Sequence, residues 1–232
     1  MKYHYDLHVH SVLSPCSDVL MTPNNLCNMV SLKGLDVFAV TDHNSAKQLS
    51  VIAEIAQSYS FLFVPGIEVC VKEGIHVLVY FRTVEDALQF DGVLETYIDQ
   101  STKGDARTGT ARLADREDFI VGELPYFPSA PLALSLRGLS SLLEPYDHLL
   151  FFAHLDRPVT GGLALVREVP ADGIELTPFA PADFLARHGL KDFLVLHNSD
   201  AHQLMDIAEK RDDNVLELPE LGIDALFRVL KR

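Results

Sequence analysis

The sequence predicts an α/β barrel built from repeated strand and helix units, and three observations lead to this expectation. The chain has 232 residues, a length that one such barrel fills. Short apolar segments recur along it, with helical spacing of apolar residues in between. Histidines and carboxylates gather at the C-terminal ends of these predicted strands, and those ends meet at one mouth in a parallel barrel. We therefore expect a single domain over residues 1–232.

Seven segments have the length and the apolar or alternating pattern of buried strands. They are Tyr3 to His10, Asp36 to Thr41, Phe61 to Pro65, Ile75 to Phe81, His148 to Ala153, Gly173 to Leu176 and Phe193 to Asn198. Between the second and third, Leu49, Ile52, Ile55, Ala56 and Tyr59 form an apolar stripe at helical spacing. A similar stripe of Ile223, Leu226, Phe227 and Leu230 predicts a C-terminal helix.

One region fits this pattern poorly. From Gln100 to Pro128, glycines and prolines interrupt a mixture of charges, with Gly104, Gly109 and Pro125 among them. A stretch of this length without its own pattern is typical of an excursion from a scaffold. We expect an insertion or lid at about residues 100–128.

The amino-acid composition limits which substrates and partners we expect. The formal net charge of −14 would repel the phosphates of a long duplex nucleic acid, which favours a small phosphorylated substrate or a short oligonucleotide, although bound cations would reduce that charge. The three cysteines, Cys16, Cys27 and Cys70, have no Cys-x-x-Cys spacing, so we expect neither a disulfide framework nor a thiolate zinc site, as in a cytoplasmic protein. The longest apolar runs, such as Val77 to Phe81, are too short to cross a bilayer, and no membrane is expected.

The first predicted strand ends in His8 and His10, whose spacing points both rings to the same side of an extended segment, where they could grip one metal ion. Such a pair alone is more often ordinary surface or core histidine. Here other predicted strands also end at or just before residues that can bind a metal ion, namely His43, Glu68, His154, Asp200 and His202. His76 stands at the start of its strand and fits the mouth less simply. Together the residues predict a metal site.

In chain order these residues resemble the four motifs of the PHP (polymerase and histidinol phosphatase) family. The matching segments are Asp6-Leu7-His8-Val9-His10-Ser11, Thr41-Asp42-His43, the Glu68 and His76 region with Ala153-His154, and Ser199-Asp200-Ala201-His202. The resemblance covers nearly the whole chain apart from Gln100 to Pro128. It implies a distorted (β/α)7 TIM-like barrel with a trinuclear metal centre at its C-terminal mouth.

The resemblance also implies the ligands of two or three divalent ions. His8, His10, Glu68 and Asp200 would hold the first ion; Glu68, His76 and His154 the second; and Asp18, His43 and His202 the third. Imidazoles with a few carboxylates suit Zn, Mn or Fe. The chain departs from the family pattern around Ser14-Pro15-Cys16-Ser17-Asp18, where Asp18 matches the family form but Cys16 is near enough to compete.

Three further residues are candidates next to the ligands. Asp6 and Asp42 could orient histidine rings through the nitrogen that does not bind metal, or could equally be strand-end turn or cap residues. Arg157, just beyond His154, could hold a substrate phosphate with its guanidinium, or could pair with Asp156 or another surface carboxylate.

The function that this pattern predicts is a metal-dependent phosphoesterase. A water or hydroxide held between the metals would attack phosphorus in line, with Glu68, Asp200 and His202 as the catalytic residues. The substrate would be a small phosphorylated metabolite, a nucleotide or a short oligonucleotide. Two alternatives stay open: an amidohydrolase that cleaves carbon–nitrogen or carbon–oxygen bonds on a similar metal barrel, and a non-catalytic module that metal stabilises.

Overall fold

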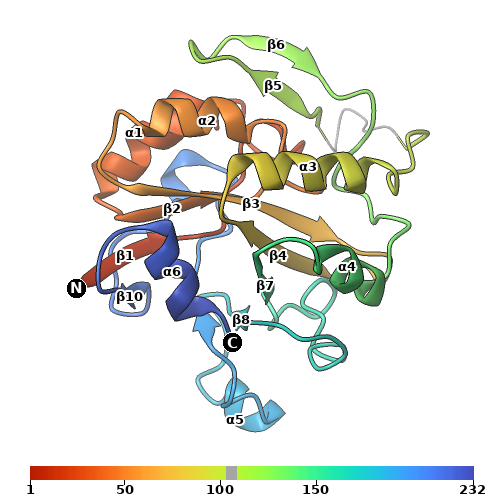
Figure 1. Ribbon diagram of the computed structural model, residues 1–232, viewed down its shortest axis with the longest axis vertical. Helices are drawn as coiled ribbons and strands as arrows, with labels where there is room; N and C mark the ends of the chain where they lie inside the picture. Colours follow the sequence, from red (N-terminus) through yellow and green to blue (C-terminus); the bar gives the residue numbers. More distant parts are fainter. Residues whose placement is uncertain (103–108) are drawn as a thin grey trace.

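The computed structural model describes residues 1–102 and 109–232, which form a mixed α/β fold around an eight-stranded, strongly curled sheet (Figure 1). The strands of this sheet, in spatial order, are β10 (Val215–Glu217), β1 (Lys2–Asp6), β2 (Val37–Val40), β3 (Leu62–Cys70), β4 (His76–Phe81), β7 (His148–Phe152), β8 (Gly173–Glu175) and β9 (Val195–Leu196). The helices are α1 (Pro23–Lys33), α2 (Leu49–Ala56), α3 (Val84–Glu95), α4 (Leu136–Leu143), α5 (Phe184–His188), the short 3-10 helix η1 (Leu204–Asp206) and α6 (Ile223–Leu230). All seven predicted strands and both predicted helices are present, with ends that differ by a few residues.

The sheet is not uniformly parallel. β1, β2 and β3 run parallel to one another, as do β7, β8 and β9, but β4 is antiparallel to both β3 and β7. The expectation of a parallel barrel is therefore wrong at β4, because a short turn over residues 71–75 joins it to β3 in place of a crossover helix. The reversed direction of β4 explains why His76 can lie at the mouth although it begins its strand. The start of an antiparallel strand lies at the same edge of the sheet as the ends of its neighbours, and His76 pairs with Cys70 at the end of β3.

The sheet curls like a barrel, but among the described residues its strand ladder does not close. The two ends of the order are β10 and β9, and β9 has only two residues to pair. An isolated parallel bridge between Val9 and Ala201 joins the segments that follow β1 and β9, with His10 N donating to Ala201 O at 2.9 Å. The two sides thus meet at the mouth, through the segments that carry His8, His10 and Asp200.

Alternate residues of each strand face two apolar clusters, one inside the curl and one under the helices. In β7, Leu149 and Phe151 belong to the interior cluster, whereas Leu150 and Phe152 belong to the cluster under the helices. The strands are therefore apolar on both faces, which is why they read as continuous apolar runs. Leu226 of α6 joins the interior cluster near β1 and β10, where the two chain ends also lie (Figure 1).

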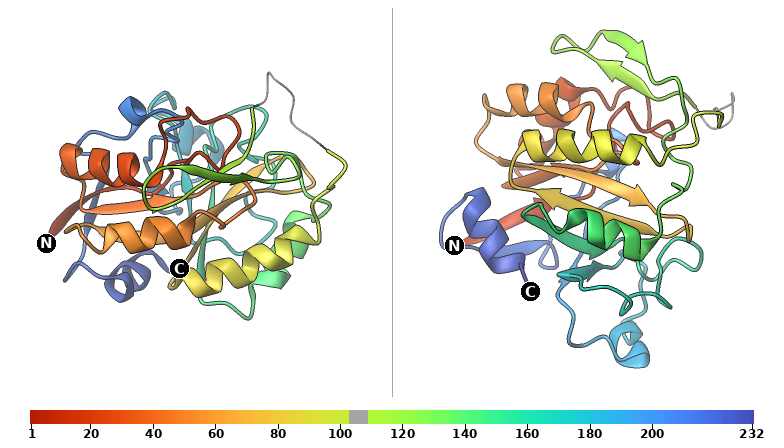
Figure 2. Two further views of the ribbon diagram at one scale, coloured as in Figure 1. Left: turned by 90° about the horizontal axis from the view of Figure 1, so that it is seen from above. Right: turned by 45° about the vertical axis from the view of Figure 1, so that its right-hand side comes forward.

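Part of the predicted insertion is a separate two-stranded hairpin. β5 (Arg112–Ala114) and β6 (Ile120–Glu123) pair only with each other within the described residues and lie outside the layer of α1, α2 and α3 (Figures 1 and 2). Arg112 N donates to Val12 O at 3.0 Å, so the hairpin is tied to the segment that follows β1. Residues 103–108 of the predicted insertion lie outside the described residues, and a lid role stays a prediction.

None of the described helices combines the length and the apolarity needed to cross a bilayer.

Candidate metal centre

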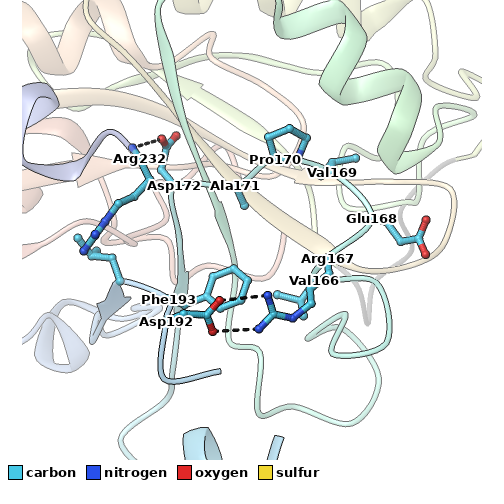
Figure 3. Close-up of a pocket in the computed structure, with 11 residues that line it drawn as sticks. Val166, Arg167, Glu168, Val169, Pro170, Ala171, Asp172, Asp192, Phe193 and Arg232 are labelled. Atoms are coloured by element: carbon cyan, nitrogen blue, oxygen red, sulfur yellow. Dashed lines mark hydrogen bonds and ion pairs between the residues drawn. The ribbon is translucent and has the colours of Figure 1, made fainter. Parts of the chain in front are cut away.

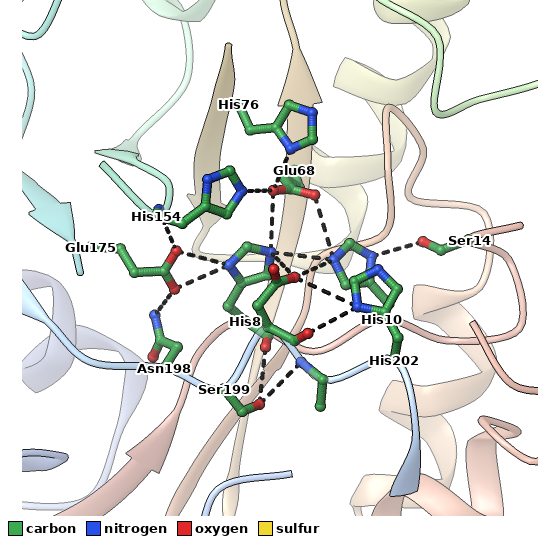
Figure 4. Close-up of polar contacts among 12 residues, drawn as sticks. His8, His10, Ser14, Glu68, His76, His154, Glu175, Asn198, Ser199 and His202 are labelled. Carbon is green, nitrogen blue, oxygen red and sulfur yellow. Dashed lines mark hydrogen bonds and ion pairs between the residues drawn. The ribbon is translucent and has the colours of Figure 1, made fainter. Parts of the chain in front are cut away.

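The carboxylate of Glu68 lies at the centre of the mouth and is 1% exposed (Figure 4). Its oxygens lie 3.3 Å from His8 Nε2, 3.4 Å from His10 Nε2, 2.7 Å from His43 Nδ1, 2.9 Å from His76 Nδ1 and 3.1 Å from His154 Nε2. These five rings come from four separate parts of the chain, which the curled sheet brings to one edge. A carboxylate in this position can bridge two metal ions.

On one side of Glu68 the donors of three residues converge. His8 Nε2 and His10 Nε2 are 3.2 Å apart, and each lies 3.2 Å from Asp200 Oδ1. Ligand atoms of His8, His10 and Asp200 all lie within 4.8 Å of one another, as do those of His43, Glu68 and His76 on the other side. Two or more rings that turn nitrogens to one point beside a carboxylate form a metal-ligand arrangement. We call His8, His10, Glu68, His76, His154 and Asp200 the Glu68 centre.

The hydrogen bonding of these residues is incomplete, in a way that a cation would complete. His43 Nδ1 and Glu68 Oε2 are close, but their geometry is not that of a hydrogen bond, and both buried atoms lack a hydrogen-bond partner among the described residues. A buried polar atom left without a partner is costly. Imidazole nitrogens and carboxylate oxygens are the donors that Zn, Mn and Fe accept, so the residues present fit divalent metal ions.

The electrostatics leave Glu68 and His10 in ligand form, whereas three other rings carry a proton that a metal must displace. Burial alone would lower the pKa of His8, His43 and His76, but the charge of the neighbouring Glu68 carboxylate, joined at His8 by Glu175 and Asp200, outweighs it and raises each pKa. Burial alone would raise the pKa of Glu68, but the charges of His76, His8 and His43 outweigh it and hold that pKa well below its usual value. Burial and the neighbouring His202 and His43 rings hold the pKa of His10 well below its usual value, so its imidazole is neutral. An ionised carboxylate and a neutral ring each offer a lone pair to a metal.

Sequence reasoning missed Glu175. Both of its oxygens lie 3.0 Å from His8 Nδ1, and it also accepts hydrogen bonds from His154 N and Asn198 Nδ2, each at 2.8 Å (Figure 4). A carboxylate on Nδ1 orients the ring and turns Nε2 toward the site. Glu175 ends β8, so the rule that site residues stand at strand ends could have found it.

The structure distinguishes Asp42 from Asp6. Asp42 accepts from Ser14 Oγ at 2.7 Å, and that hydroxyl lies 2.8 Å from His10 Nδ1, so Asp42 orients the ring through a serine. Asp6 instead accepts from Ser199 Oγ at 2.6 Å and from Ser199 N at 3.1 Å. The expectation that Asp6 orients a histidine ring is therefore wrong, because its carboxylate is occupied by the segment that leads into Asp200.

A second group of rings lies beside the Glu68 centre. Ligand atoms of His10, His43 and His202 lie within 4.8 Å of one another, and the His10 and His202 rings are stacked with centroids 4.1 Å apart. The thiol of Cys16 is a neighbour of His43 and His202, although its sulfur is not among the ligand atoms that converge within 4.8 Å in the described part of the chain. Burial raises the pKa of the Cys16 thiol, but these two rings lower it to about 6. We call Cys16, His43 and His202 the rim group.

Asp18, predicted as the third-metal ligand, is not part of these groups. Its side chain is exposed, and its carboxylate accepts a hydrogen bond from Leu20 N at 2.8 Å, which caps a turn. Its backbone N donates to His202 O at 2.8 Å, so the backbone of Asp18 lies beside the rim group. The Asp18 carboxylate is used within its own turn instead.

Arg157 faces the site. Its Nη1 lies 2.8 Å from Asp200 Oδ2, and its side chain is 46% exposed. The alternative pairing with Asp156 is not formed, because Asp156 accepts from Thr177 Oγ1 at 2.5 Å and from Thr177 N at 2.8 Å. Arg157 also lines a cavity of about 420 Å³ next to the centre, together with His154, Phe179 and Asp200. The positively charged guanidinium of Arg157 therefore lies between this cavity and Asp200, a candidate metal ligand.

A larger cavity of about 480 Å³ lies elsewhere, near the C-terminus (Figure 3). Its Arg167 is held by both oxygens of Asp192 and lies over the Phe193 ring at 5.0 Å from the centroid. None of the candidate metal ligands lines it. Size alone does not make it the functional site, because the charges of Arg167 and Asp192 already pair with each other.

Backbone strain concentrates at the mouth. Of the four non-glycine residues with positive φ in the described part of the chain, three lie here: His154, Asp200 and Asn44, with φ angles of 32°, 54° and 48°. Non-glycine residues in this region cost of order 1–3 kcal/mol each and cluster at functional sites. Two of the three are candidate ligands, so the fold holds their side chains in place at a cost to the backbone.

Comparison with known proteins identifies the fold. A scan against protein-family models and a search of curated proteins both found no match. Two Endonuclease Q structures are similar: one in complex with a 27-mer duplex that carries an abasic lesion (TM-score 0.73, 19% identity, 99% of this chain) and the lesion-specific enzyme from Pyrococcus furiosus (TM-score 0.74, 20% identity, 100% of this chain). This chain spans 56% of each Endonuclease Q chain.

Two shorter proteins are also similar in structure. One is a candidate metal-dependent phosphoesterase from Bifidobacterium adolescentis, with a TM-score of 0.63 and 15% identity over 97% of this chain and 95% of the other. The other is an amidohydrolase from Chromobacterium violaceum with bound sulfate, with a TM-score of 0.60 and 17% identity over 98% of this chain and 96% of the other. At these identities the likeness shows a shared fold.

Proposed function

We propose that this protein is a metal-dependent phosphoesterase of the PHP type, acting on small phosphorylated metabolites, nucleotides or short oligonucleotides. The observation that carries the proposal is the buried Glu68 carboxylate, within 3.4 Å of five imidazoles. The order of these residues along the chain is that of the four PHP motifs. The likeness in fold to Endonuclease Q and to the Bifidobacterium protein supports the proposal of a metal-dependent phosphoesterase.

Two or three divalent ions, of Zn, Mn or Fe, would be held at this mouth. His8, His10 and Asp200 lie on one side of Glu68, and His76 and His154 lie on the other, which suits a carboxylate shared by two ions. Bound ions supply positive charge that lowers the pKa of an attacking water and neutralises the oxygens of a phosphate.

The chain's own residues would bind and orient the substrate. The Arg157 guanidinium has donors left beyond its bond to Asp200 and is half-exposed, so it can hold a phosphate at the edge of the cavity. The His202 side chain is 28% exposed, and its Nδ1 lies 2.9 Å from Asp200 O, which leaves Nε2 for the site. We assign Glu68, Asp200 and His202 as the catalytic residues on this placement.

The amidohydrolase alternative is favoured by one observation, the likeness in fold to the Chromobacterium protein. A guanidinium that reaches a candidate metal ligand favours phosphate esters instead, because Arg matches phosphate geometry bidentately. A module without catalysis would not need such a cation at the centre.

Duplex DNA is a second candidate substrate, because one Endonuclease Q structure contains a duplex with an abasic lesion. The net charge of −14 disfavours a long duplex, and this chain matches only 56% of the Endonuclease Q chain. We therefore place duplex DNA behind the smaller substrates and include it in the test.

The test is metal analysis followed by an activity screen. We expect at least two divalent ions per chain, and hydrolysis of an aryl phosphate or an aryl phosphodiester that chelation abolishes and added Mn²⁺ or Zn²⁺ restores. The screen then covers sugar phosphates, nucleotides, short oligonucleotides, a duplex with an abasic site, and amide and carboxylic ester substrates. Metal-loaded protein that cleaves amides but no phosphate ester would overturn the proposal, as would protein that binds no metal.

A further inference from the structure

We propose that the ring of Phe179 stacks on the base of a nucleotide substrate, and that this site recognises the presence of a base but not its identity. The inference rests on the proposed phosphoesterase function and narrows its substrate class. Three observations carry it: the exposure of Phe179, the hydrogen bonds of the cavity wall, and the way in which the loop is held.

Phe179 is an apolar side chain that the fold leaves uncovered next to the Glu68 centre. It is 91% exposed, the highest value among the large apolar side chains of the described residues. It lines the cavity of about 420 Å³ that Arg157, His154 and Asp200 also line. A single exposed apolar residue is ordinary on a protein surface, but this one faces a cavity of ligand size. One cavity therefore joins an aromatic ring to a guanidinium and to two candidate metal ligands.

The polar side chains of the cavity wall are already bonded within the protein. Asp156 accepts hydrogen bonds from Thr177 N at 2.8 Å and from Thr177 Oγ1 at 2.5 Å. Asn198 Nδ2 donates to Glu175 at 2.8 Å, and its Oδ1 accepts from a backbone N at 2.9 Å. Ser199 Oγ donates to a buried carboxylate at 2.6 Å. The wall is therefore poorly suited to recognising a substrate by its hydroxyl or amino groups, and its apolar face is what it offers.

The loop that carries Phe179 is held by a proline and by hydrogen bonds. Pro178 precedes the ring and restricts the backbone there. Phe179 N donates to Thr177 Oγ1 at 3.2 Å, and Thr177 is bonded in turn to Asp156. Asp156 directly precedes Arg157, so the loop after β8 is tied to the segment after β7. The aromatic ring and the guanidinium are thus presented from two connected loops.

The chemistry of a phenyl ring determines what it can hold. Every nucleobase has a π-face, and stacking on an aromatic side chain tolerates any base; its loss weakens binding by roughly 5- to 150-fold. A ring without hydrogen-bonding groups does not distinguish the edges of different bases. With a phosphate at Arg157 and a base on Phe179, both ends of one nucleotide would lie in the same cavity.

The kinetic test compares nucleoside 5′-monophosphates with ribose 5-phosphate, which has the same phosphate and sugar but no base. In the metal-loaded full chain we expect kcat/KM to be at least about tenfold higher for the nucleotides, and the four common bases to agree within about threefold. Phe179→Ala lowers the nucleotide values toward that of ribose 5-phosphate, and Phe179→Tyr keeps them. Phe119→Ala, the matched loss of an exposed ring that does not line this cavity, changes neither.

A binding test does not depend on hydrolysis. The chain has no tryptophan, so Phe179→Trp introduces a single fluorescent reporter at the proposed stacking position. We expect adenosine 5′-monophosphate to quench this fluorescence and ribose 5-phosphate to leave it unchanged. A 5′-phosphorylated dinucleotide that quenches at the same concentration identifies a free nucleotide as the source of the base, and one that quenches at a concentration at least about tenfold lower identifies the end of an oligonucleotide.

The two tests separate this inference from the proposed function. Quenching without hydrolysis of any phosphate ester supports the stacking position and overturns the proposed function. Equal hydrolysis of nucleotides and ribose 5-phosphate, without quenching, overturns the stacking position and leaves the proposed function in place. Nucleotide hydrolysis that Phe179→Ala leaves unchanged, or a preference of more than about tenfold for one base, would also overturn the inference.

Discussion

The Glu68 centre and the rim group are built in different ways, although they share one mouth. The donors of the Glu68 centre stand on or next to strands: Glu68 lies within β3 and His76 begins β4, and His8 and Glu68 are at most 1% exposed. The rim group depends on loops, with Cys16 exposed and the His202 side chain 28% exposed. Strands leave side chains little freedom, whereas loops need extra bonds to reach the same precision.

The support behind the two groups differs as well. Glu175 holds His8 and the backbone of His154 through buried hydrogen bonds. The rim group is held by backbone hydrogen bonds between loops, such as the one from Asp18 N to His202 O. The difference teaches that the donors of the Glu68 centre are held in place by buried hydrogen bonds, whereas the rim group depends on the position of its loops. Each of the following variants is expected to separate the two.

The largest effect is expected from Glu68→Gln. The neutral amide loses the charge that two ions would share, so we expect the loss of both ions of the Glu68 centre and a fall in phosphoesterase kcat/KM on the order of 10²–10³-fold or more. Metal stabilises only the state that binds it, so the rise in Tm on adding metal should also disappear. Metal content, steady-state kinetics and thermal unfolding measure the three outcomes.

The matched control for this variant is Asp91→Asn. Asp91 is also a buried carboxylate, 2% exposed, but its partners are Lys47, with which it forms an ion pair, and Ser45 Oγ, from which it accepts a hydrogen bond. We expect lower stability, by roughly 1–3 kcal/mol, with metal content unchanged. Full metal content and activity in Glu68→Gln would show that Glu68 bridges no ions.

A smaller effect is expected from Glu175→Gln, which tests the support of the deep centre. The amide cannot accept at both positions that now face His8 Nδ1, His154 N and Asn198 Nδ2, so we expect metal affinity to fall by roughly 10–100-fold. Excess metal should restore most of the activity, because no ligand is removed. Ions of the rim group should be unaffected.

Asp172→Asn makes the same chemical change just before β8 begins, at the opposite end from Glu175. Asp172 is buried and accepts from Leu150 N and Arg232 N, far from the mouth. We expect its metal affinity to equal that of the parent. Equal metal affinity in Glu175→Gln and the parent would mean that His8 does not depend on this carboxylate.

The sequence predicts the deep centre better than the rim, for a physical reason. Strand ends are visible as the last residues of apolar runs, and this rule brings His8, Glu68 and His154 together without knowledge of the fold. The prediction misses the direction of β4 because β3 continues to Cys70, beyond its predicted end at Pro65. The connection that is left, residues 71–75 with Gly74 at positive φ, is too short for a parallel crossover. Cys16 and Asp18 could not be separated either, since a loop side chain takes its direction from hydrogen bonds to distant residues such as His202.

The smallest effect is expected from Arg157→Gln, which tests whether the cavity beside the deep centre receives a phosphate. The guanidinium is half-exposed, so its loss should change stability by about 1 kcal/mol or less and leave both groups of ions in place. We expect KM for a phosphorylated substrate to rise roughly tenfold with a smaller change in kcat, since a charge-assisted hydrogen bond to the ground-state phosphate is lost. Arg137→Gln, which breaks a surface pair with Glu168, is the matched control and should change neither constant. A fall in kcat alone would mean that Arg157 acts on the reacting atoms, and unchanged kinetics would mean that its bond to Asp200 is only a surface ion pair.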